Sequence, residues 1–155
     1  MTEQKIEKIL VDYLSEAVAA AGANIQVVGV LQPTVGEDVK GVEDGSAEGL
    51  LVVKAYPRQY ETFTSVYCTV QLDVTLTVRS DADYNGRTYL DVTEGVVNAL
   101  HRVQKSFQQF SQRFEIEGEW DAVGFRMDGG DCGLDKENCV WQYTQSVAVD
   151  GIIQN

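Results

Sequence analysis

The stretch that decides the fold runs from Val66 to Arg79 and reads VYCTVQLDVTLTVR. Its even positions are all apolar, whereas its odd positions are polar or aromatic. Such a period of two predicts a half-buried strand that turns its polar face toward water or a partner. At about 3.3 Å per residue the strand would be about 46 Å long. A chain of this size has a radius of gyration of only about 15 Å. We therefore expect the strand to bend or to extend beyond its own domain as an arm.

The elements around this strand follow from the same kind of pattern. Apolar residues three and four apart predict a helix from Thr2 to about Ala21, stopped by Gly22. A second helix is predicted from about Thr88 to Phe110, with its apolar stripe at Leu90, Val97, Leu100, Val103, Phe107 and Phe110. Further strands are predicted over residues 25–31, 50–56, 114–120, 123–127 and 140–153.

The order of these elements predicts the fold class. Short connections in the second half of the chain favour antiparallel pairing. We expect an α+β fold in which two helices pack on a twisted, mostly antiparallel sheet with a long central strand. Residues 1–155 form a single domain, in which segments 34–49 and 128–138 are loops rich in glycine and acidic residues.

Charge narrows the range of functions. The chain has 24 acidic and 12 basic residues, for a net charge of −12. This excess argues against a general nucleic-acid binder or a binder of anionic membranes, because both need clustered cations. Most of the net charge comes from two segments, 35–49 and 115–137. They are either solvated loops or parts of one acidic surface that keeps a polyanion away.

No pattern for catalysis or metal binding is present. His101 is the only histidine and lies on a predicted helix, so a surface or half-buried position is expected. The carboxylates of segment 128–138 lack the spacing of a calcium-binding loop. Phosphate-binding, dinucleotide-binding and nucleophile-elbow motifs are absent from the sequence. We therefore expect no enzyme, no cofactor and no metal site.

Three cysteines, an odd number without a secretory signal, favour reduced thiols in a cytoplasmic product. Cys68 falls on the apolar side of the long strand, where a free cysteine packs as a small hydrophobic residue. Cys132 and Cys139 lie seven residues apart and flank a hairpin. We expect two reduced thiols at the base of this hairpin, or an oxidised pair after cell lysis. No stretch is apolar enough to span a membrane, so no membrane partner is expected.

The element order and two stretches of sequence resemble the tail terminator proteins of long-tailed bacteriophages. These stretches are VQLDVTLTVRSD, which ends the long strand, and TYLDVTEGVVNALHRV in the second helix. The resemblance is best over about residues 50–110, and segments 34–49 and 128–138 fit it loosely. The tail terminator family has no catalytic residues that could be assigned to positions of this chain.

The resemblance implies a ring, typically of six subunits, that caps the finished tail tube, stops its polymerisation and presents a surface for head–tail joining. The partners would be further copies of the chain, the tail tube protein and a head-completion or connector protein. DNA would pass through the lumen without specific binding. The protein would be made in the host cytoplasm and reside at the head-proximal end of the tail.

Two groups of residues are the candidates for this role. The acids expected to line a lumen or an interface are Glu37, Asp38, Glu43, Asp44, Glu48, Glu115, Glu117 and Glu119. The polar positions expected on an intersubunit strand are Tyr67, Thr69, Gln71, Asp73, Thr75 and Thr77. The alternatives are another tail or neck structural protein, such as a tube subunit or a head-completion protein, and, less favoured, an α+β module that binds a small ligand.

Overall fold

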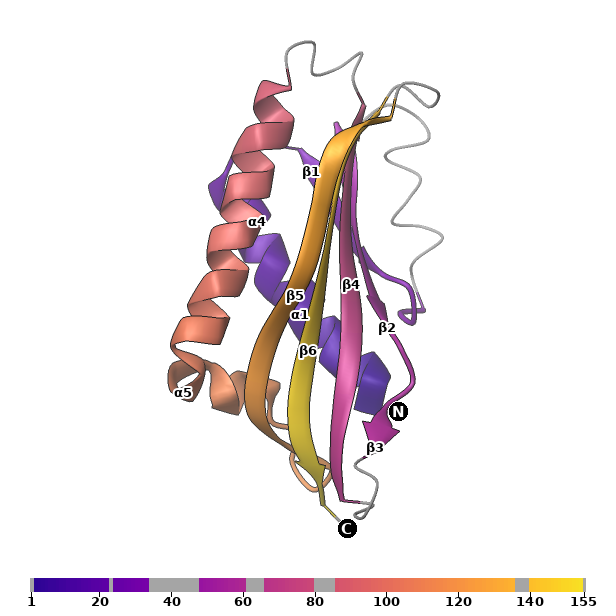
Figure 1. Ribbon diagram of the computed structural model, residues 1–155, viewed down its shortest axis with the longest axis vertical. Coiled ribbons are helices and arrows are strands. Elements are labelled where there is room, and N and C mark those ends of the chain that lie inside the picture. Colours follow the sequence, from indigo (N-terminus) through magenta and orange to yellow (C-terminus); the bar gives the residue numbers. More distant parts are fainter. Residues whose placement is uncertain are drawn as a thin grey trace.

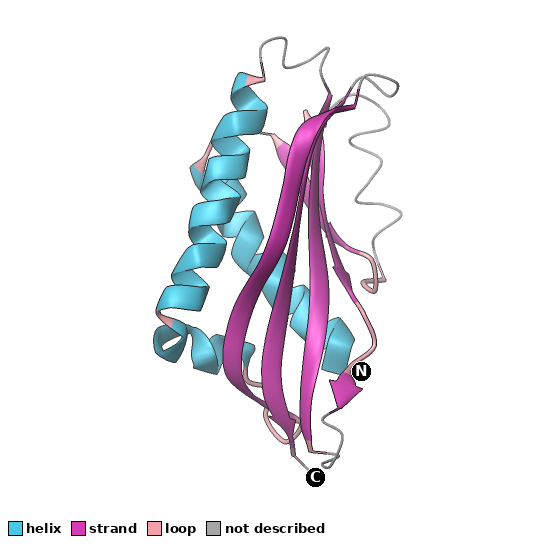
Figure 2. Cartoon of the chain, viewed as in Figure 1, coloured by secondary structure: helices cyan, strands magenta, loops and turns pink. Residues whose placement is uncertain are grey.

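Two long helices pack on one face of a six-stranded sheet in the computed structural model (Figures 1 and 2). The structure describes residues 2–22, 24–33, 48–60, 66–79, 86–135 and 140–154. The helices are α1 (Thr2–Ala20), α4 (Arg87–Lys105) and the short α5 (Phe107–Phe110), followed by the 3-10 turn η1 (Ser111–Phe114). The strands are β1 (Ile25–Gly29), β2 (Gly49–Ala55), β3 (Gln59–Tyr60), β4 (Tyr67–Arg79), β5 (Trp120–Asp135) and β6 (Val140–Ile153).

The predicted fold class is confirmed. The strands follow the order β1-β2-β4-β6-β5, and β3 pairs with one end of β4. Only β1 and β2 are parallel, whereas every other pair is antiparallel. The long strand β4 is therefore central, and the described helices all cover the same side of the sheet (Figure 1).

The alternation of β4 places its even positions in the core. Cys68, Val70, Leu72, Val74, Leu76 and Val78 are all 0–1% exposed. Burying each side chain of this size stabilises the fold by about 1.5–3 kcal/mol relative to leaving it in water. β4 is not a projecting arm, because β6 pairs with it along its whole length, from Tyr67 to Arg79. The sheet itself is elongated and bends with it (Figure 1).

Helix α1 ends close to the predicted position. It stops at Ala20, and Gly22 takes a left-handed φ of 74°, which glycine adopts without steric cost. The face of α1 against the sheet buries Ile6, Leu10 and Leu14, none of which is exposed.

Helix α4 differs from the prediction in its length and in its buried stripe. It ends at Lys105, and a separate short helix follows. Leu90 is 64% exposed, whereas Tyr89 is buried. The reason is a specific contact, since the Tyr89 ring packs 5.5 Å from the Trp141 ring and its hydroxyl donates to the carbonyl oxygen of Gln142. The buried positions are Tyr89, Val92, Val96, Ala99, Leu100 and Val103.

The strand predicted over residues 114–120 is wrong. Phe114 ends η1, and an isolated bridge joins Ile116 to Trp120 across a tight turn. Gly118 takes a φ of 76° in this turn, a conformation that side chains with a Cβ rarely adopt. The apolar residues at 114, 116 and 120 point inward because the turn brings them there, and not because they share a strand face.

The loop predicted over residues 128–138 is also wrong for its described part. β5 continues to Asp135, pairing with β6 through register shifts at Ala122/Gly124 and Met127/Gly130. Its glycines favour a loop locally, but cross-strand pairing overrides this preference. A Cβ at Gly130 would lie 2.7 Å from Oε1 of the buried Gln145, so the missing side chain makes room for that amide. Most of the predicted loop 34–49 lies outside the described residues, and its last residue, Gly49, begins β2.

Candidate functional site

The main candidate surface is the side of the sheet opposite the described helices, and we call it the open face (Figure 2). It presents the odd positions of β4 and the even positions of β6. The predicted intersubunit residues Tyr67, Thr69, Gln71, Asp73, Thr75 and Thr77 all lie on it, exposed or half-buried. Their neighbours across β6 are polar for most of the length, with Thr144 opposite Thr75 and Gln142 opposite Thr77.

One carboxylate of the open face, Asp73, is held by two hydroxyl groups. Tyr56 donates to its Oδ2 at 2.7 Å, and Ser146 donates to its Oδ1 at 2.9 Å. The hydrogen bond to Asp73 raises the pKa of Tyr56, because ionising the phenol would remove the donor and set two negative charges together. The Lys54 ammonium lies 5.0 Å from the centre of the Tyr56 ring.

The second carboxylate, Asp150, is paired with a cation. Arg126 donates from Nε to Oδ2 at 2.9 Å and from Nη2 to Oδ1 at 3.0 Å, and the Thr69 hydroxyl donates to Oδ1 at 2.5 Å. Burial alone would raise the pKa of Asp150, but the hydrogen bonds from Arg126 and Thr69 outweigh it and lower the pKa. The carboxylates of both networks therefore already have partners within the protein.

The geometry limits how β4 can take part in assembly. Its backbone pairs with β6 along one edge, and with β2 and β3 along the other. Only its side chains can therefore meet another molecule. An intersubunit role of β4, which stays a prediction, would therefore use its polar side chains and not its backbone.

The described acidic residues of the predicted lumen do not come together. The backbone of Glu48 bonds to Asn24 and Arg79 at one end of the sheet. Glu115, Glu117 and Glu119 flank the turn that precedes Trp120, at the other end. Glu37, Asp38, Glu43 and Asp44 lie outside the described residues.

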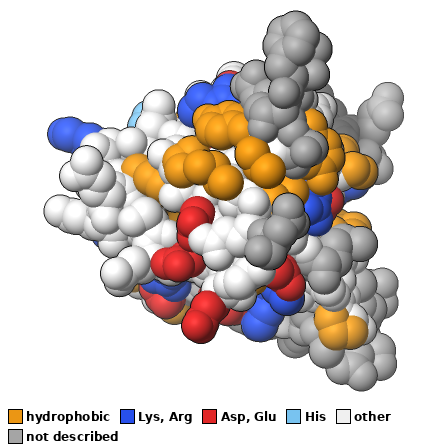
Figure 3. All heavy atoms as spheres, turned by 90° about the horizontal axis from the view of Figure 1, so that it is seen from below, with side chains coloured by type: hydrophobic (Ala, Val, Ile, Leu, Met, Phe, Trp, Pro, Cys, Tyr) orange, Lys and Arg blue, Asp and Glu red, His pale blue; other side chains and the backbone are white. Residues whose placement is uncertain are grey.

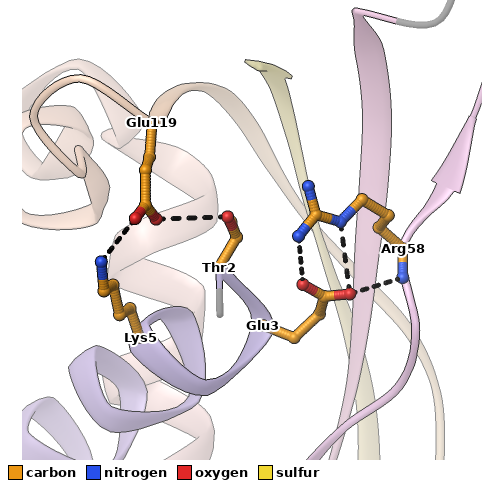
Figure 4. Close-up of polar contacts among 5 residues, drawn as sticks. All are labelled: Thr2, Glu3, Lys5, Arg58 and Glu119. Carbon is orange, nitrogen blue, oxygen red and sulfur yellow. Dashed lines mark hydrogen bonds and ion pairs between the residues drawn. The ribbon is translucent and has the colours of Figure 1, made fainter. Parts of the chain in front are cut away.

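Glu119 belongs to a small polar cluster at the start of α1 (Figure 4). It accepts hydrogen bonds from Lys5 at 2.6 Å and from Thr2 at 3.3 Å. The bond from Lys5 is the main reason that the pKa of Glu119 is lowered. In the same view Arg58 donates to Glu3 through Nη2 at 2.6 Å and through its backbone nitrogen at 3.2 Å. These contacts fix the first turn of α1 to the sheet and to the 115–119 turn.

Sequence reasoning missed an apolar patch at this end of the molecule. Tyr60, Val66, Val123 and Ile152 are each 39–52% exposed and lie where β4 begins and β6 ends. Hydrophobic side chains gather on this end beside acidic and basic ones (Figure 3). No periodic signal identifies the patch, because its members come from four separate segments.

The remaining candidates for chemistry are isolated. His101 is exposed on α4, as expected for a surface histidine. Cys68 is buried, and burial raises the pKa of its thiol. Cys132 is a free, exposed thiol on β5, and Cys139 lies outside the described residues. In the described part of the chain, no three His, Cys, Asp or Glu side chains are grouped closely enough to hold a metal ion.

A shallow groove of about 400 Å³ runs between α1 and α4. Small residues, including Ala17, Ala20 and Gly95, line it, and Glu94 and Arg102 stand at its rim. The polar side chains that line it are Asp91, Glu94, Asn98 and Arg102, all from α4, so the groove is an open surface feature and not an enclosed apolar pocket.

Comparison of the chain with protein-family models and with curated proteins finds no match to either. Within the described ranges, none of the helices has the length and apolar character needed to cross a membrane.

Proposed function

We propose that this protein is a structural subunit of a bacteriophage tail, a tail terminator whose copies form a ring on the end of the tail tube. The observation that carries the proposal is the open face. It is a polar surface on which none of the described helices packs, and it runs the length of a sheet whose other side carries the hydrophobic core. Such a surface suits the wall of a passage better than a binding pocket.

The chemistry of the open face supports passage of DNA without binding. Hydroxyl and amide groups are frequent on it, its Arg126 is neutralised by Asp150, and its exposed Lys54 lies opposite the carboxylate-bearing Asp73 on the neighbouring strand. Binding of a nucleic acid through its phosphates requires cations that can release counterions. The net charge of −12 adds a general repulsion of the polyanion. In the ring we place the open face toward the lumen and the helices outside.

Enzymatic roles and ligand-binding roles receive less support. Asp73 and Asp150 of the open face are held by partners within the protein, and the thiols and the histidine lie apart from them. The groove between α1 and α4 lacks the enclosed apolar lining of a small-molecule site. The tail tube protein and a head-completion protein are the partners that the ring would join.

Deletion of the gene from a phage that carries it tests the proposal. Terminator function predicts overlong tails or tails without heads, seen by electron microscopy. Tails of normal length attached to heads would contradict it. Polymerisation of the purified protein into open tubes would instead identify a tube subunit.

The placement of the open face has its own test. Complementation with Thr75→Lys/Thr77→Lys adds two cations to a lumen wall, so particles should assemble and then release DNA slowly. The matched control is Gln104→Lys/Gln108→Lys, which adds the same charge on the exposed helix side. Equal rates of DNA release from both would show that the open face does not line the passage.

A further inference from the structure

The two outer strands of the sheet, β1 and β5, each have one edge without a strand partner. The order β1-β2-β4-β6-β5 leaves them at opposite ends of the sheet, and no strand in the described ranges pairs with their outer edges. An open edge presents unpaired N–H and C=O groups, and proteins either block such an edge or use it for pairing. β5 is irregular as far as Gly130, and from there to Asp135 it pairs regularly with β6.

The regular part of β5 lies at the same height in the sheet as β1. One row of paired residues runs Ile25, Gly49, Val78, Trp141 and Leu134. Another runs Val27, Leu51, Leu76, Tyr143 and Cys132, and a third runs Gly29, Val53, Val74, Gln145 and Gly130. The segments 25–29 and 130–134 therefore form matching left and right edges of one band across the sheet.

The directions of the two edges match as well. β1 is parallel to β2, β2 is antiparallel to β4, β4 to β6, and β6 to β5. β5 therefore runs opposite to β1. If β1 of one copy lies beside β5 of the next, the two strands pair in antiparallel fashion. Because both edges lie at one height, this contact needs no shift along the strands. A heterologous contact without a shift closes into a ring when its rotation also closes, whereas a contact with a shift builds a helix.

The side chains at this contact are complementary. Without a shift, Ile25 faces Leu134 and Val27 faces Cys132, all on the side of the sheet that carries the helices. Leu134 is 42% exposed in the single chain, and Ile25 and Val27 are half-buried, so the contact removes apolar surface from water. On the open face Gln26 meets Gly133, which has no side chain to obstruct it. The apolar layer and the polar layer both continue across the junction.

We propose that β1 (Ile25–Gly29) pairs in register with residues 130–134 of β5 in a second copy, so that one sheet continues from subunit to subunit. This inference rests on the proposed ring and names the surface by which the ring closes.

Disulfide trapping tests the pairing directly. Residues opposite each other in an antiparallel pair have Cα atoms about 4.5–5.5 Å apart, within the range that a disulfide bridges. In a Cys139→Ser background, Val27→Cys should form a disulfide with the native Cys132 of the next copy. Mild oxidation at increasing protein concentration should give a ladder on non-reducing gels that ends at the closed ring, with the 27–132 linkage identified by peptide mass spectrometry.

Two control variants define the register. Gln26→Cys in the same background places the thiol on the opposite face of β1 and should give no ladder. Val27→Cys/Cys132→Ser removes the partner thiol and should remain uncrosslinked. The absence of a 27–132 disulfide throughout the concentration series, or a product linked through Cys132 of both copies, would overturn the pairing.

A second variant does not depend on cysteine chemistry. Leu134→Lys replaces a side chain that is already exposed, so the fold should remain intact. At the contact, however, the added ammonium group would be placed against the apolar side chain of Ile25 of the next copy. Sedimentation velocity should show that the dissociation constant for assembly is at least tenfold higher than that of wild type. Leu90→Lys makes the same change at the exposed Leu90 on α4 and should assemble as wild type does. Equal assembly of both variants would contradict the proposal.

Failure of the pairing and failure of the proposed function give different results. If tails without the protein are overlong but no 27–132 disulfide forms, the terminator role stands and the ring closes through another surface. If the disulfide-linked ring forms but tails without the protein are normal, the pairing stands and the terminator role fails.

Discussion

The hydroxyl of Tyr13 donates a hydrogen bond of 2.7 Å to the backbone carbonyl oxygen of Ala99, joining α1 to α4 in the interior. Tyr13 is 6% exposed and Ala99 is 1% exposed. The Phe110 ring packs edge-on against the Tyr13 ring, with ring centres 5.6 Å apart. The helix layer is therefore held by a polar contact as well as by apolar packing.

The substitution Tyr13→Phe should lower the free energy of unfolding by about 1 kcal/mol, because it removes one buried hydrogen bond and keeps the ring. Urea denaturation followed by circular dichroism measures the change. Tyr60→Phe is the matched control, since Tyr60 is 52% exposed and its hydroxyl meets only the Arg58 side chain at the surface, so its loss should be clearly smaller. Equal free energies of unfolding for wild type and Tyr13→Phe would show that this hydrogen bond makes no net contribution to stability.

Gly151→Ala should be strongly destabilising. A Cβ at position 151 would clash with Cζ2 of the Trp120 indole, which is fully buried, and would lie 2.7 Å from the backbone oxygen of Asp121. Overpacking of this kind costs about 1–3 kcal/mol, and the fluorescence of Trp120 should change as its ring shifts. Gly129→Ala is the control, because no atom lies within 4 Å of the added Cβ. A stable Gly151→Ala with unchanged fluorescence would contradict this packing.

Arg58→Met should destabilise the protein most at neutral pH. Burial acts to raise the pKa of Glu3, but the hydrogen bonds from Arg58 outweigh it and lower the pKa. A carboxylate with a lowered pKa contributes stability above its ordinary pKa, and that contribution is lost as the pH falls through its folded-state pKa. We expect a loss of about 2 kcal/mol at neutral pH, shrinking as the pH falls below about 4.

Denaturation at a series of pH values checks this expectation. Lys5→Met removes the exposed ion pair with Glu119 instead and should cost less than about 0.5 kcal/mol. A difference between wild type and Arg58→Met that stays constant down to acid pH would mean that the ion pair is not its source.

Alkaline pH should unfold the protein through its tyrosines. Burial is the main cause that raises the pKa of Tyr13, Tyr89 and Tyr143. A phenol with a raised pKa contributes stability below its unfolded pKa of about 10, and this stability is lost as the pH rises through the folded pKa. The melting temperature should therefore stay constant up to about pH 10 and decrease above it. Tyrosinate absorbance that rises fully before the fold is lost would contradict it.

β4 and α1 could be predicted from the sequence because the spacing of their apolar residues stays constant over many residues. Thirteen residues of strict alternation in β4 and a continuous stripe in α1 leave no competing assignment. The open face was predicted residue by residue for the same reason, since alternate side chains of a strand must share a face. The α+β class followed from the order of the elements.

The predictions that were wrong fall where local pattern and tertiary pairing disagree. The glycines and acidic residues at 128–135 are typical of a loop, yet this segment forms a strand because β6 is long enough to pair with it. The alternation at 114–120 resembles a strand, yet Gly118 turns the chain back within a few residues. In α4, Tyr89 rather than Leu90 is buried because Trp141 is available to pack against it.

The sequence by itself determined which residues share a face, because periodicity is a local property of helices and strands. Only the tertiary structure decided which faces and edges meet. The equal height of Ile25 and Leu134 at opposite edges of the sheet depends on four successive strand registers. The pairing of Asp150 with Arg126 and the burial of Tyr89 likewise depend on contacts between distant segments. Such contacts are fixed by packing and cross-strand hydrogen bonds, which no single stretch of the chain contains.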